Sequence, residues 1–345
     1  MNNRELLTSS YDFTLPKKLI ATHPTTPRDS AKLLVYDREK DKISHVKFSD
    51  LEKFIPQNCA LIFNDTKVIK ARLFGKKESG GKIELLLNRA INAHDINVYI
   101  RGKVKTALKI LFTKDFKEDL VAEVKELLDD GSRVVNFFSN GRLLRFEELL
   151  PILDKIGHVP LPPYIQREDN REDESEYQSV FAKKEGAVAA PTASLHFTKE
   201  QHERVCKNFV HAFVTLHVGS GTFKPIECDT ITEHPMHSEY YAISDSAKKI
   251  IDSGIPLLSV GTTSTRTIEF YARSKTQKGE ANLFLHPNNR PLRVNHLLTN
   301  FHLPKSTLLM LVASFVGLEK TQELYKAAIE NEYRFYSYGD AMLIL

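Results

Sequence analysis

The feature that most restricts the fold of this chain is a change in its apolar pattern near residue 150. From residue 60 to about residue 150 the sequence holds short apolar or alternating runs, among them ALIFN, GKIELLLNRAI and INVYIRGK. Turn-forming residues at 79–81 (SGG) and 129–131 (DDG) separate several of these runs. Short strands joined by tight turns predict a small β-barrel or sandwich.

After this stretch, helical periodicity alternates with strands. A capping-box pattern, T-x-x-Q from Thr198, opens a helix, and the apolar run VHAFVTLHVG follows as a buried strand. A second helix, which contains AKKIIDS, starts at Ser244 or Ser246, and IPLLSVG is the next strand. A further helix is expected from about Thr267. This alternation predicts an α/β fold with a mainly parallel sheet.

Residues 1–59 also mix extended and helical signals, so we expect the β-rich stretch to be an insertion. The expected organisation is a discontinuous α/β domain, formed by residues 1–59 and 151–345, that is interrupted by an inserted small β-barrel domain at residues 60–150. Residues 167–184 are highly charged and nearly devoid of aliphatic side chains, which is typical of a solvated, mobile loop.

Composition excludes some classes of protein. No run of about 18 apolar residues occurs, and the N-terminus lacks a secretory pattern, so we expect a soluble, cytoplasmic protein with no membrane partner. The net charge of +4 is compatible with a polyanionic partner but does not indicate one. Cys59, Cys206 and Cys228 are widely spaced and form no CxxC pair, so buried, reduced thiols are expected.

Five clusters of His, Gly, Ser and Thr are candidates for a binding site. The first, EGAVAAPTASLHFT at residues 185–198, combines small residues, which permit close approach of a ligand, with the polar groups of Thr192, Ser194 and His196. A loop that only caps the following helix is the alternative.

The second cluster, TLHVGSGTFKPI at residues 215–226, has His217 near the end of an apolar strand, followed by Gly219 and Gly221. Ligands of open α/β sheets bind outside the carboxyl ends of the strands, where this glycine turn is expected. The pattern lacks the third glycine of a dinucleotide fingerprint.

The third cluster, HPMHSEYY at residues 234–241, brings His234, His237 and Glu239 close together. The order HxxHxE is not an established zinc signature, and on a strand His237 and Glu239 would share one face while His234 points away. We therefore interpret His237 and Glu239 as a proton-transfer pair or as hydrogen-bond partners of a ligand, with a metal site as the alternative.

Two clusters precede helices. In SVGTTSTRTIEF, residues 259–270, a hydroxyl-rich turn is followed by Arg266, which predicts an anion pocket at a helix N-terminus; ordinary N-capping by Thr265 is the alternative. In TNFHLPKSTLLMLVASF, residues 299–315, Phe301 and His302 precede a helix capped by Ser306 and either face a ligand or are buried.

Ten segments in order resemble the S-adenosylmethionine:tRNA ribosyltransferase-isomerase family of queuosine biosynthesis. They are YDFTLPKKLIATHP, FNDTKVIKARLFGKK, GGKIELLL, GHVPLPPYI, EGAVAAPTASLHF, TLHVGSGTFKPI, MHSEYY, VGTTSTRTIE, TNFHLPKSTLLMLV and YRFYSYGDAMLI. The resemblance implies an α/β domain with an inserted β-barrel. It also implies transfer and isomerisation of the ribosyl group of S-adenosylmethionine, a co-substrate, onto 7-aminomethyl-7-deazaguanine at the tRNA wobble position. Epoxyqueuosine, adenine and methionine are the implied products. We expect no metal, and a monomer.

One segment departs from the family pattern. Where the family usually has a Pro-Gly-aromatic turn and then Val-Asp, this chain reads LHPNNRPLRVN, with Asn288, Asn289 and Asn295. Any function that needs a carboxylate at position 295 is therefore in question.

Residue chemistry within these motifs gives the expected roles. Proton transfer is expected from His217 and Glu239, and next from His196 and His237. Donor binding is expected from Thr192, Ser194, Gly219, Gly221, Thr262, Thr263 and Arg266, the last through the methionine carboxylate. RNA contacts are expected from Arg72, Lys76, Lys77, Arg101, His302, Lys305 and Arg334, with base stacking by Phe301, Tyr333 or Tyr338.

The alternatives to the transferase function are a noncatalytic RNA-binding protein and a metal-dependent hydrolase that uses the histidines.

Overall fold

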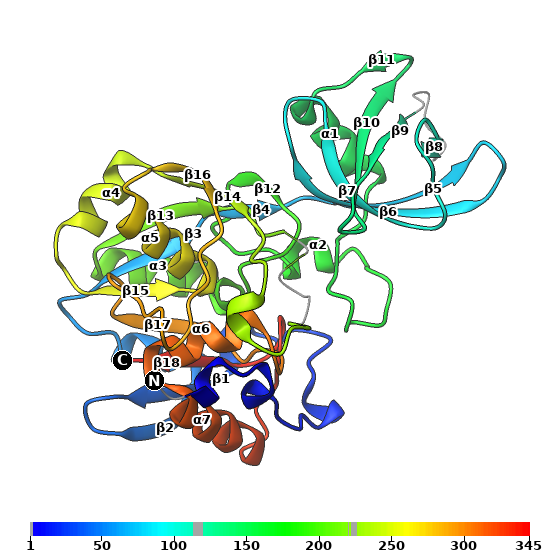
Figure 1. The fold of residues 1–345 in the computed structure, drawn as a ribbon. Helices are drawn as coiled ribbons and strands as arrows, with labels where there is room; N and C mark the ends of the chain where they lie inside the picture. Colours follow the sequence, from blue (N-terminus) through cyan, green and yellow to red (C-terminus); the bar gives the residue numbers. More distant parts are fainter. Residues whose placement is uncertain (1–2, 113–119, 220, 222–225) are drawn as a thin grey trace.

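A nine-stranded mixed sheet forms the larger part of the molecule (Figure 1). The computed structural model describes residues 3–112, 120–219, 221 and 226–345. The strand order is β16-β14-β13-β3-β15-β17-β18-β1-β2, and the four neighbours β13, β3, β15 and β17 run parallel. The strand bounds are β1 Lys32–Asp37, β2 Lys42–Lys47, β3 Ala60–Asn64, β13 His211–Leu216, β14 Glu239–Ile243, β15 Leu257–Val260, β16 Lys278–Ala281, β17 His296–Asn300 and β18 Ala341–Ile344.

Helices cover both faces of this sheet. Their bounds are α3 Lys199–Asn208, α4 Asp245–Asp252, α5 Thr262–Ser274, α6 Thr307–Val316 and α7 Leu318–Glu330. Leu61 and Phe63 of β3 share a core with α3, whereas Ala60 and Ile62 of the same strand share a core with α4 and α5. Because successive side chains of a strand point to opposite faces, a wholly apolar strand such as β3 is suited to the centre of a sheet covered on both sides.

Three of the helix starts agree with the expected capping residues. The side-chain oxygens of Thr198, Ser244 and Ser306 each accept a hydrogen bond from a backbone N–H in the first turn, at 3.1 to 3.2 Å. The start of α5 was wrongly predicted: the helix begins at Thr262 rather than near Thr267, with Gly261 as the residue before its first turn.

The smaller part is a closed barrel (Figure 1). Six antiparallel strands pair in the order β10-β7-β6-β5-β8-β9, and the pairing of β9 with β10 closes the ring. The short strand β11 pairs antiparallel with the end of β10. The bounds are β5 Arg72–Lys77, β6 Lys82–Ala90, β7 Ile96–Arg101, β8 Lys109–Phe112, β9 Leu120–Leu127, β10 Arg133–Ser139 and β11 Arg142–Leu143. Leu149 and Leu153 of α1, Phe146–Ile156, belong to the apolar core of the barrel. The predicted fold class, an α/β domain with an inserted small barrel, is confirmed.

Both expected limits of the barrel need adjustment. Residues 60–64 form β3 in the large sheet, because an apolar run of this length fits a buried strand of either part equally well. Residue 150 falls inside α1, which packs on the barrel. We therefore propose an inserted domain of about residues 71–156, within a discontinuous domain formed by the rest of the chain.

The charged segment 167–184 is not a simple solvated loop. It contains α2, Asp173–Glu176, and the carboxylate of Asp173 is buried, where it accepts hydrogen bonds from Arg167 at 2.6 and 2.7 Å and from the Tyr338 hydroxyl at 3.1 Å. Opposite charges within the segment compensate each other, which composition does not reveal. A further pair of strands, β4 Thr66–Val68 and β12 Lys184–Ala187, runs parallel next to this segment.

Two further sequence expectations concern the thiols and membranes. All three cysteines are free; Cys59 is buried, and Cys206 and Cys228 are partly exposed. Within the described ranges, no helix is long and apolar enough to cross a bilayer.

Candidate active site

A pocket of about 630 Å³, counting the space open to solvent, lies at the carboxyl ends of β13, β15 and β17. Its walls are Val218 after β13, residues 261–263 after β15 and residues 299–303 at the end of β17, closed by residues 189–193. Parallel strands end together at this edge, so the loops that follow them converge there. We call this space the strand-end pocket. The strand-end pocket is lined by five of the predicted site residues: Thr192, Thr262, Thr263, Phe301 and His302.

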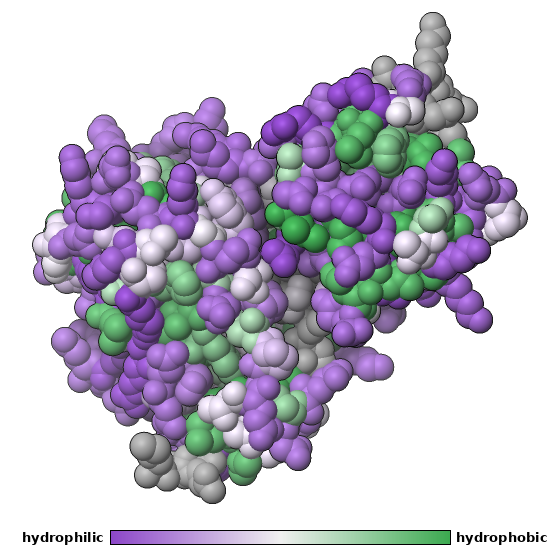
Figure 2. Space-filling model, turned by 45° about the horizontal axis from the view of Figure 1, so that its top comes forward, coloured by the Kyte–Doolittle hydropathy of each residue, from purple (hydrophilic) through white to green (hydrophobic). Residues whose placement is uncertain are grey.

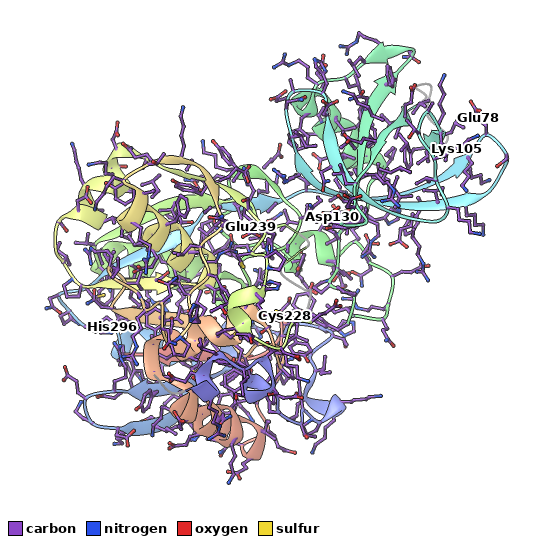
Figure 3. The ribbon with its side chains drawn as sticks, in the orientation of Figure 1. Glu78, Lys105, Asp130, Cys228, Glu239 and His296 are labelled. Atoms are coloured by element: carbon purple, nitrogen blue, oxygen red, sulfur yellow. The ribbon has the colours of Figure 1, made fainter. Side chains whose placement is uncertain are left out.

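A larger, open cleft lies between the sheet and the barrel. It has a volume of about 1870 Å³ including open solvent. One wall carries His217, Gly219, Gly221, His237 and Glu239. The barrel wall includes Asn88, Arg89, Asn97, Tyr99 and Asp130. Figure 3 shows Glu239 and Asp130 on the facing sides of the two parts. The remainder of the predicted glycine turn, Ser220 and residues 222–225, lies outside the described residues.

The pocket and the cleft are neighbours. His217 and Gly219 line the cleft, while Val218 between them lines the strand-end pocket. Gly186 lines the cleft, and Ala189 lines the strand-end pocket. Two short segments of chain therefore separate the strand-end pocket from the cleft.

His217 is held on several sides at the cleft wall. Its Nδ1 lies 2.7 Å from Thr66 Oγ1, and its ring stacks on Tyr240 with 5.7 Å between centroids and 19° between planes. A Cβ atom at Gly186 would lie 2.9 Å from His217 Nε2, so a glycine is required beside this ring. Burial lowers the pKa of His217 to about 4, which keeps the imidazole neutral near pH 7.

Glu239 forms a buried ion pair with Arg266. Its Oε2 lies 2.5 Å from Arg266 Nη1, and its Oε1 accepts a hydrogen bond from the backbone N–H of Gly219 at 2.9 Å. Burial alone would raise the pKa of Glu239, but the Arg266 guanidinium, with His237 3.6 Å away, outweighs it and holds the pKa well below its ordinary value. Both carboxylate oxygens of Glu239 thus already accept hydrogen bonds, and Arg266 is already paired. The two residues bind each other in this structure, which does not support the predicted roles of proton transfer for Glu239 and carboxylate binding for Arg266.

Several predicted site residues are almost completely buried. His196 Nε2 bonds Asn300 Oδ1 at 3.0 Å, and Ser194 is completely buried; neither lines the strand-end pocket or the cleft. His302 faces Thr299 Oγ1 at 2.8 Å, and burial lowers its pKa to about 3. The aromatic rings proposed to stack on a base are almost fully buried: Phe301, Tyr333 and Tyr338. Rings buried in this way are not placed to stack on an RNA base in this structure, because aromatic residues next to a polar motif can equally pack inward.

Several of the cations that were predicted to bind RNA are already bonded within the protein. Arg72 bonds the carbonyl of Leu161 at 3.0 Å, and Lys77 bonds the carbonyl of Lys103. Lys305 pairs with Asp12 at 2.7 Å, and Arg334 bonds the carbonyl of His23 at 3.1 Å. On the barrel, Lys76 and Arg101 are exposed.

An exposed aromatic ring accompanies these two cations. Phe74, with 53% of its surface exposed, lies two residues before Lys76 on β5, and therefore on the same face of that strand. Its ring contacts the His158 ring edge-on at 5.0 Å. Figure 2 shows hydrophobic patches among mainly hydrophilic residues on the visible surface of the barrel. Phe74 was not identified from the sequence, although an aromatic residue between cations is a recognisable signal.

The asparagines that depart from the family pattern have structural contacts. Asn295 Oδ1 accepts a hydrogen bond from the Leu257 N–H at 3.0 Å, and Asn289 Nδ2 donates to the carbonyl of Phe284 at 2.7 Å. Asn288 is exposed. None of the three lines the strand-end pocket or the cleft. An amide oxygen at position 295 supplies the same acceptor as a carboxylate would.

Asn64 is a site residue that sequence reasoning missed. Its side chain is fully buried, donates to the carbonyl of Leu216 and to Thr263 Oγ1, both at 3.0 Å, and accepts from the N–H groups of Leu216 and Thr66. It thereby ties together the ends of β3 and β13 and the start of α5. The signal was the polar triplet Asn-Asp-Thr directly after the apolar run ALIF.

No group of three or more His, Cys, Asp or Glu side chains placed to hold a metal ion occurs in the described part of the chain. The fold and the paired spaces instead define an open α/β protein with a strand-end ligand site next to an inserted barrel. The chain belongs to the queuosine biosynthesis protein family, whose family model matches residues 8–344. The resemblance found in the sequence is thus confirmed.

Full-length relatives support this membership. The chain is 76% identical to a protein of Sulfurimonas denitrificans, in an alignment that covers 100% of both chains. It is 59% identical to a protein of a Nitratiruptor species, in an alignment that covers 99% of both chains. Both are named S-adenosylmethionine:tRNA ribosyltransferase-isomerase. A solved structure, an S-adenosylmethionine tRNA ribosyltransferase from Thermotoga maritima, is 30% identical over 97% of this chain and 100% of its own, with a TM-score of 0.53.

Proposed function

We propose that this protein is an S-adenosylmethionine:tRNA ribosyltransferase-isomerase. It transfers and isomerises the ribosyl group of S-adenosylmethionine onto 7-aminomethyl-7-deazaguanine at the tRNA wobble position, with epoxyqueuosine, adenine and methionine as products. The observation that carries the proposal is the position of the strand-end pocket and the cleft on either side of residues 217–219. A donor in one space and a base in the other are within reach of each other there.

We assign S-adenosylmethionine to the strand-end pocket. The pocket wall includes the first turn of α5, where free N–H groups and the positive end of the helix dipole favour a carboxylate. The hydroxyls of Thr192 and Thr262 add polar groups beside the small apolar side chains of residues 189–191 and 193. With Arg266 paired to Glu239, this helix terminus is the better partner for the methionine carboxylate.

We assign the deazaguanine to the cleft and proton transfer to His217. The sulfonium of S-adenosylmethionine acidifies the adjoining ribose carbon. His217 is neutral near pH 7, so its unprotonated nitrogen can accept that proton, which leaves the electron pair of the C–H bond on the carbon. Glu239 and Arg266 act through position, because Glu239 holds the N–H of Gly219 beside His217. His237, which is partly exposed at the cleft wall, is the remaining candidate for the proton that the departing adenine needs.

We assign the RNA contact to the barrel face that carries Phe74, Lys76 and Arg101. An anticodon base must be unstacked before an enzyme can modify it, and exposed aromatic rings with nearby cations bind unstacked loops. We further propose that the protein acts as a monomer in the cytoplasm, where tRNA is available.

The proposal is tested by mixing the protein, S-adenosylmethionine and tRNA that carries the deazaguanine, then measuring adenine and methionine by chromatography. We expect equal release of both, and none with the same tRNA carrying guanine. Binding of tRNA without adenine release above the enzyme-free level would favour a noncatalytic RNA-binding protein. Activity that a chelator abolishes would favour a metal-dependent hydrolase. Either result overturns the assignment.

A further inference from the structure

Thr66 contacts the imidazole of His217 on the side away from the cleft. Thr66 is fully buried, and its Oγ1 lies 2.7 Å from His217 Nδ1, inside the range of a strong hydrogen bond. The same hydroxyl also lies 3.5 Å from the carbonyl oxygen of Lys184, its neighbour in the pairing of β4 with β12. The hydroxyl therefore has two partners and one proton.

The number of protons on the Thr66 hydroxyl, the Lys184 carbonyl and the His217 ring limits the direction of the hydrogen bonds between them. The arrangement that gives every one of these groups a partner directs the Thr66 hydroxyl proton to the Lys184 carbonyl oxygen, which can only accept, across a long contact of 3.5 Å. Thr66 Oγ1 then accepts from His217, which requires a proton on Nδ1 of the neutral ring. The unprotonated nitrogen is Nε2.

Gly186 lies at the opposite edge of the ring. A Cβ atom at Gly186 would lie 2.9 Å from both Nε2 and Cδ2 of His217, and the backbone φ of +145° at Gly186 is one that other residues rarely adopt. Both residues line the cleft. Stacking on the Tyr240 ring fixes the plane of the imidazole. The backbone N–H of His217 also donates to the backbone carbonyl of Tyr240, at 2.9 Å.

We propose that Thr66 is a positioning residue that fixes His217 in the Nδ1–H tautomer, so that Nε2 presents its lone pair at the boundary of the two spaces, to the ribose carbon of S-adenosylmethionine that extends there from the strand-end pocket. In the reaction, the substrate C–H bond breaks, an Nε2–H bond forms, and the carbon keeps the electron pair. Thr66 Oγ1 continues to accept from Nδ1–H when the ring becomes positively charged, and this bond strengthens with the charge. The inference rests on the proposed role of His217 as the base.

The test combines a tautomer measurement with kinetics on T66V, T66S and T321V. Valine keeps the shape of threonine but removes the acceptor, whereas serine keeps the hydroxyl. Thr321 is a matched control, because it is also buried and its hydroxyl bonds a backbone carbonyl, that of Gly317 at 2.7 Å, in α7.

In ¹⁵N NMR of histidine-labelled protein, with the His217 signals identified by their loss in H217Q, we expect a protonated Nδ1 and an unprotonated Nε2 in the wild type and in T66S. T66V should shift the ring toward the Nε2–H form. The kcat of T66V should fall by about tenfold or more, a part of what general-base catalysis typically contributes, with little change in KM for either substrate. T66S and T321V should retain kcat near the wild-type value.

Two results overturn the inference: a wild-type His217 protonated on Nε2, or a T66V protein with unchanged tautomer and kcat. Failure of the proposed function is seen separately, as absence of adenine release by the wild type, because the NMR measurement does not depend on turnover.

Discussion

The guanidinium of Arg266 lies 2.5 Å from the carboxylate of Glu239, and the two side chains are only 4% and 2% exposed. Removal of one member of such a pair leaves a buried charge without its partner. We expect R266M to lower the free energy of unfolding by about 3–5 kcal/mol, measured by urea denaturation.

Two further variants separate charge burial from packing. The double variant E239L/R266M should recover much of the loss, because well-packed apolar residues often replace a buried pair without cost. E332Q, which removes the exposed pair of Glu332 with Lys18, should have no measurable effect. Equal effects of R266M and E332Q would contradict this account.

Buried histidines should make the protein sensitive to acid. Burial lowers the pKa of His196 to about 4 and that of His302 to about 3. The unfolded chain protonates these rings below about pH 6.5, whereas the folded chain does not until the lower values, so the unfolded state binds more protons in this window. The stabilisation is complete above about pH 6.5 and is lost as the pH falls toward 3, with a slope of up to about 1.4 kcal/mol per pH unit for each group. H302Q should have a shallower slope in urea titrations; a curve parallel to that of the wild type would count against the buried neutral state.

Replacement of His217 should affect chemistry more than binding. In single-turnover assays, H217Q should release adenine about 10²- to 10⁴-fold more slowly, the usual contribution of a general base, while calorimetry finds S-adenosylmethionine binding intact. H211Q is the control, because His211 lies at the opposite end of β13 and bonds the carbonyl of Phe209. Wild-type turnover by H217Q would remove this residue from the mechanism.

Gly186 should tolerate no side chain. In G186A the new Cβ atom would meet the His217 ring at 2.9 Å, so we expect a large loss of turnover. G80A is a matched control: Gly80 also has a positive φ, +85°, but a Cβ atom there has no neighbour among the described residues within 4 Å. G80A therefore has the backbone strain without the contact. Similar losses of activity in the two variants would show that strain alone is responsible.

The barrel face should contribute to tRNA affinity through two separable terms. F74A should weaken binding by about 1–3 kcal/mol through lost stacking, with little change in salt dependence. R101A should reduce the magnitude of the slope of log K, the association constant for tRNA, against the logarithm of the salt concentration by about 0.7–0.9. V210A, which truncates an exposed apolar side chain on the other part of the molecule, should leave affinity unchanged. Wild-type affinity of both F74A and R101A would exclude this face as the docking surface.

Local sequence signals predicted local structure well. The capping residues Thr198, Ser244 and Ser306 bond the first helical turns as expected, because a capping bond involves only residues three apart. The run ALIFN was correctly predicted as a strand but assigned to the wrong sheet. Its neighbours in that sheet, β13 and β15, follow about 150 and 200 residues later, and a short apolar run carries no information about them.

The site was predicted less completely than the fold. The clusters around His217 and Thr262 do meet at the strand ends, as the rule for α/β sheets predicts. The pairing of Arg266 with Glu239 joins residues on different elements 27 positions apart, and the burial of Phe301 depends on α7. Such contacts are decided by tertiary packing, which a motif does not encode.

The pairing of β1 with β18 has a consequence for how the molecule folds. A hydrogen bond at the start of this pairing, from the Lys32 N–H to the carboxylate of Asp340, the residue before β18, spans 308 positions, whereas every barrel strand lies within one contiguous stretch. Long-range closures cost more chain entropy and slow folding. The barrel can therefore form early and alone, while the strand-end pocket, which needs segments near residues 190, 262, 300 and 336, is completed late. A partly folded chain would then present the barrel face, the proposed RNA contact, before it can use the donor.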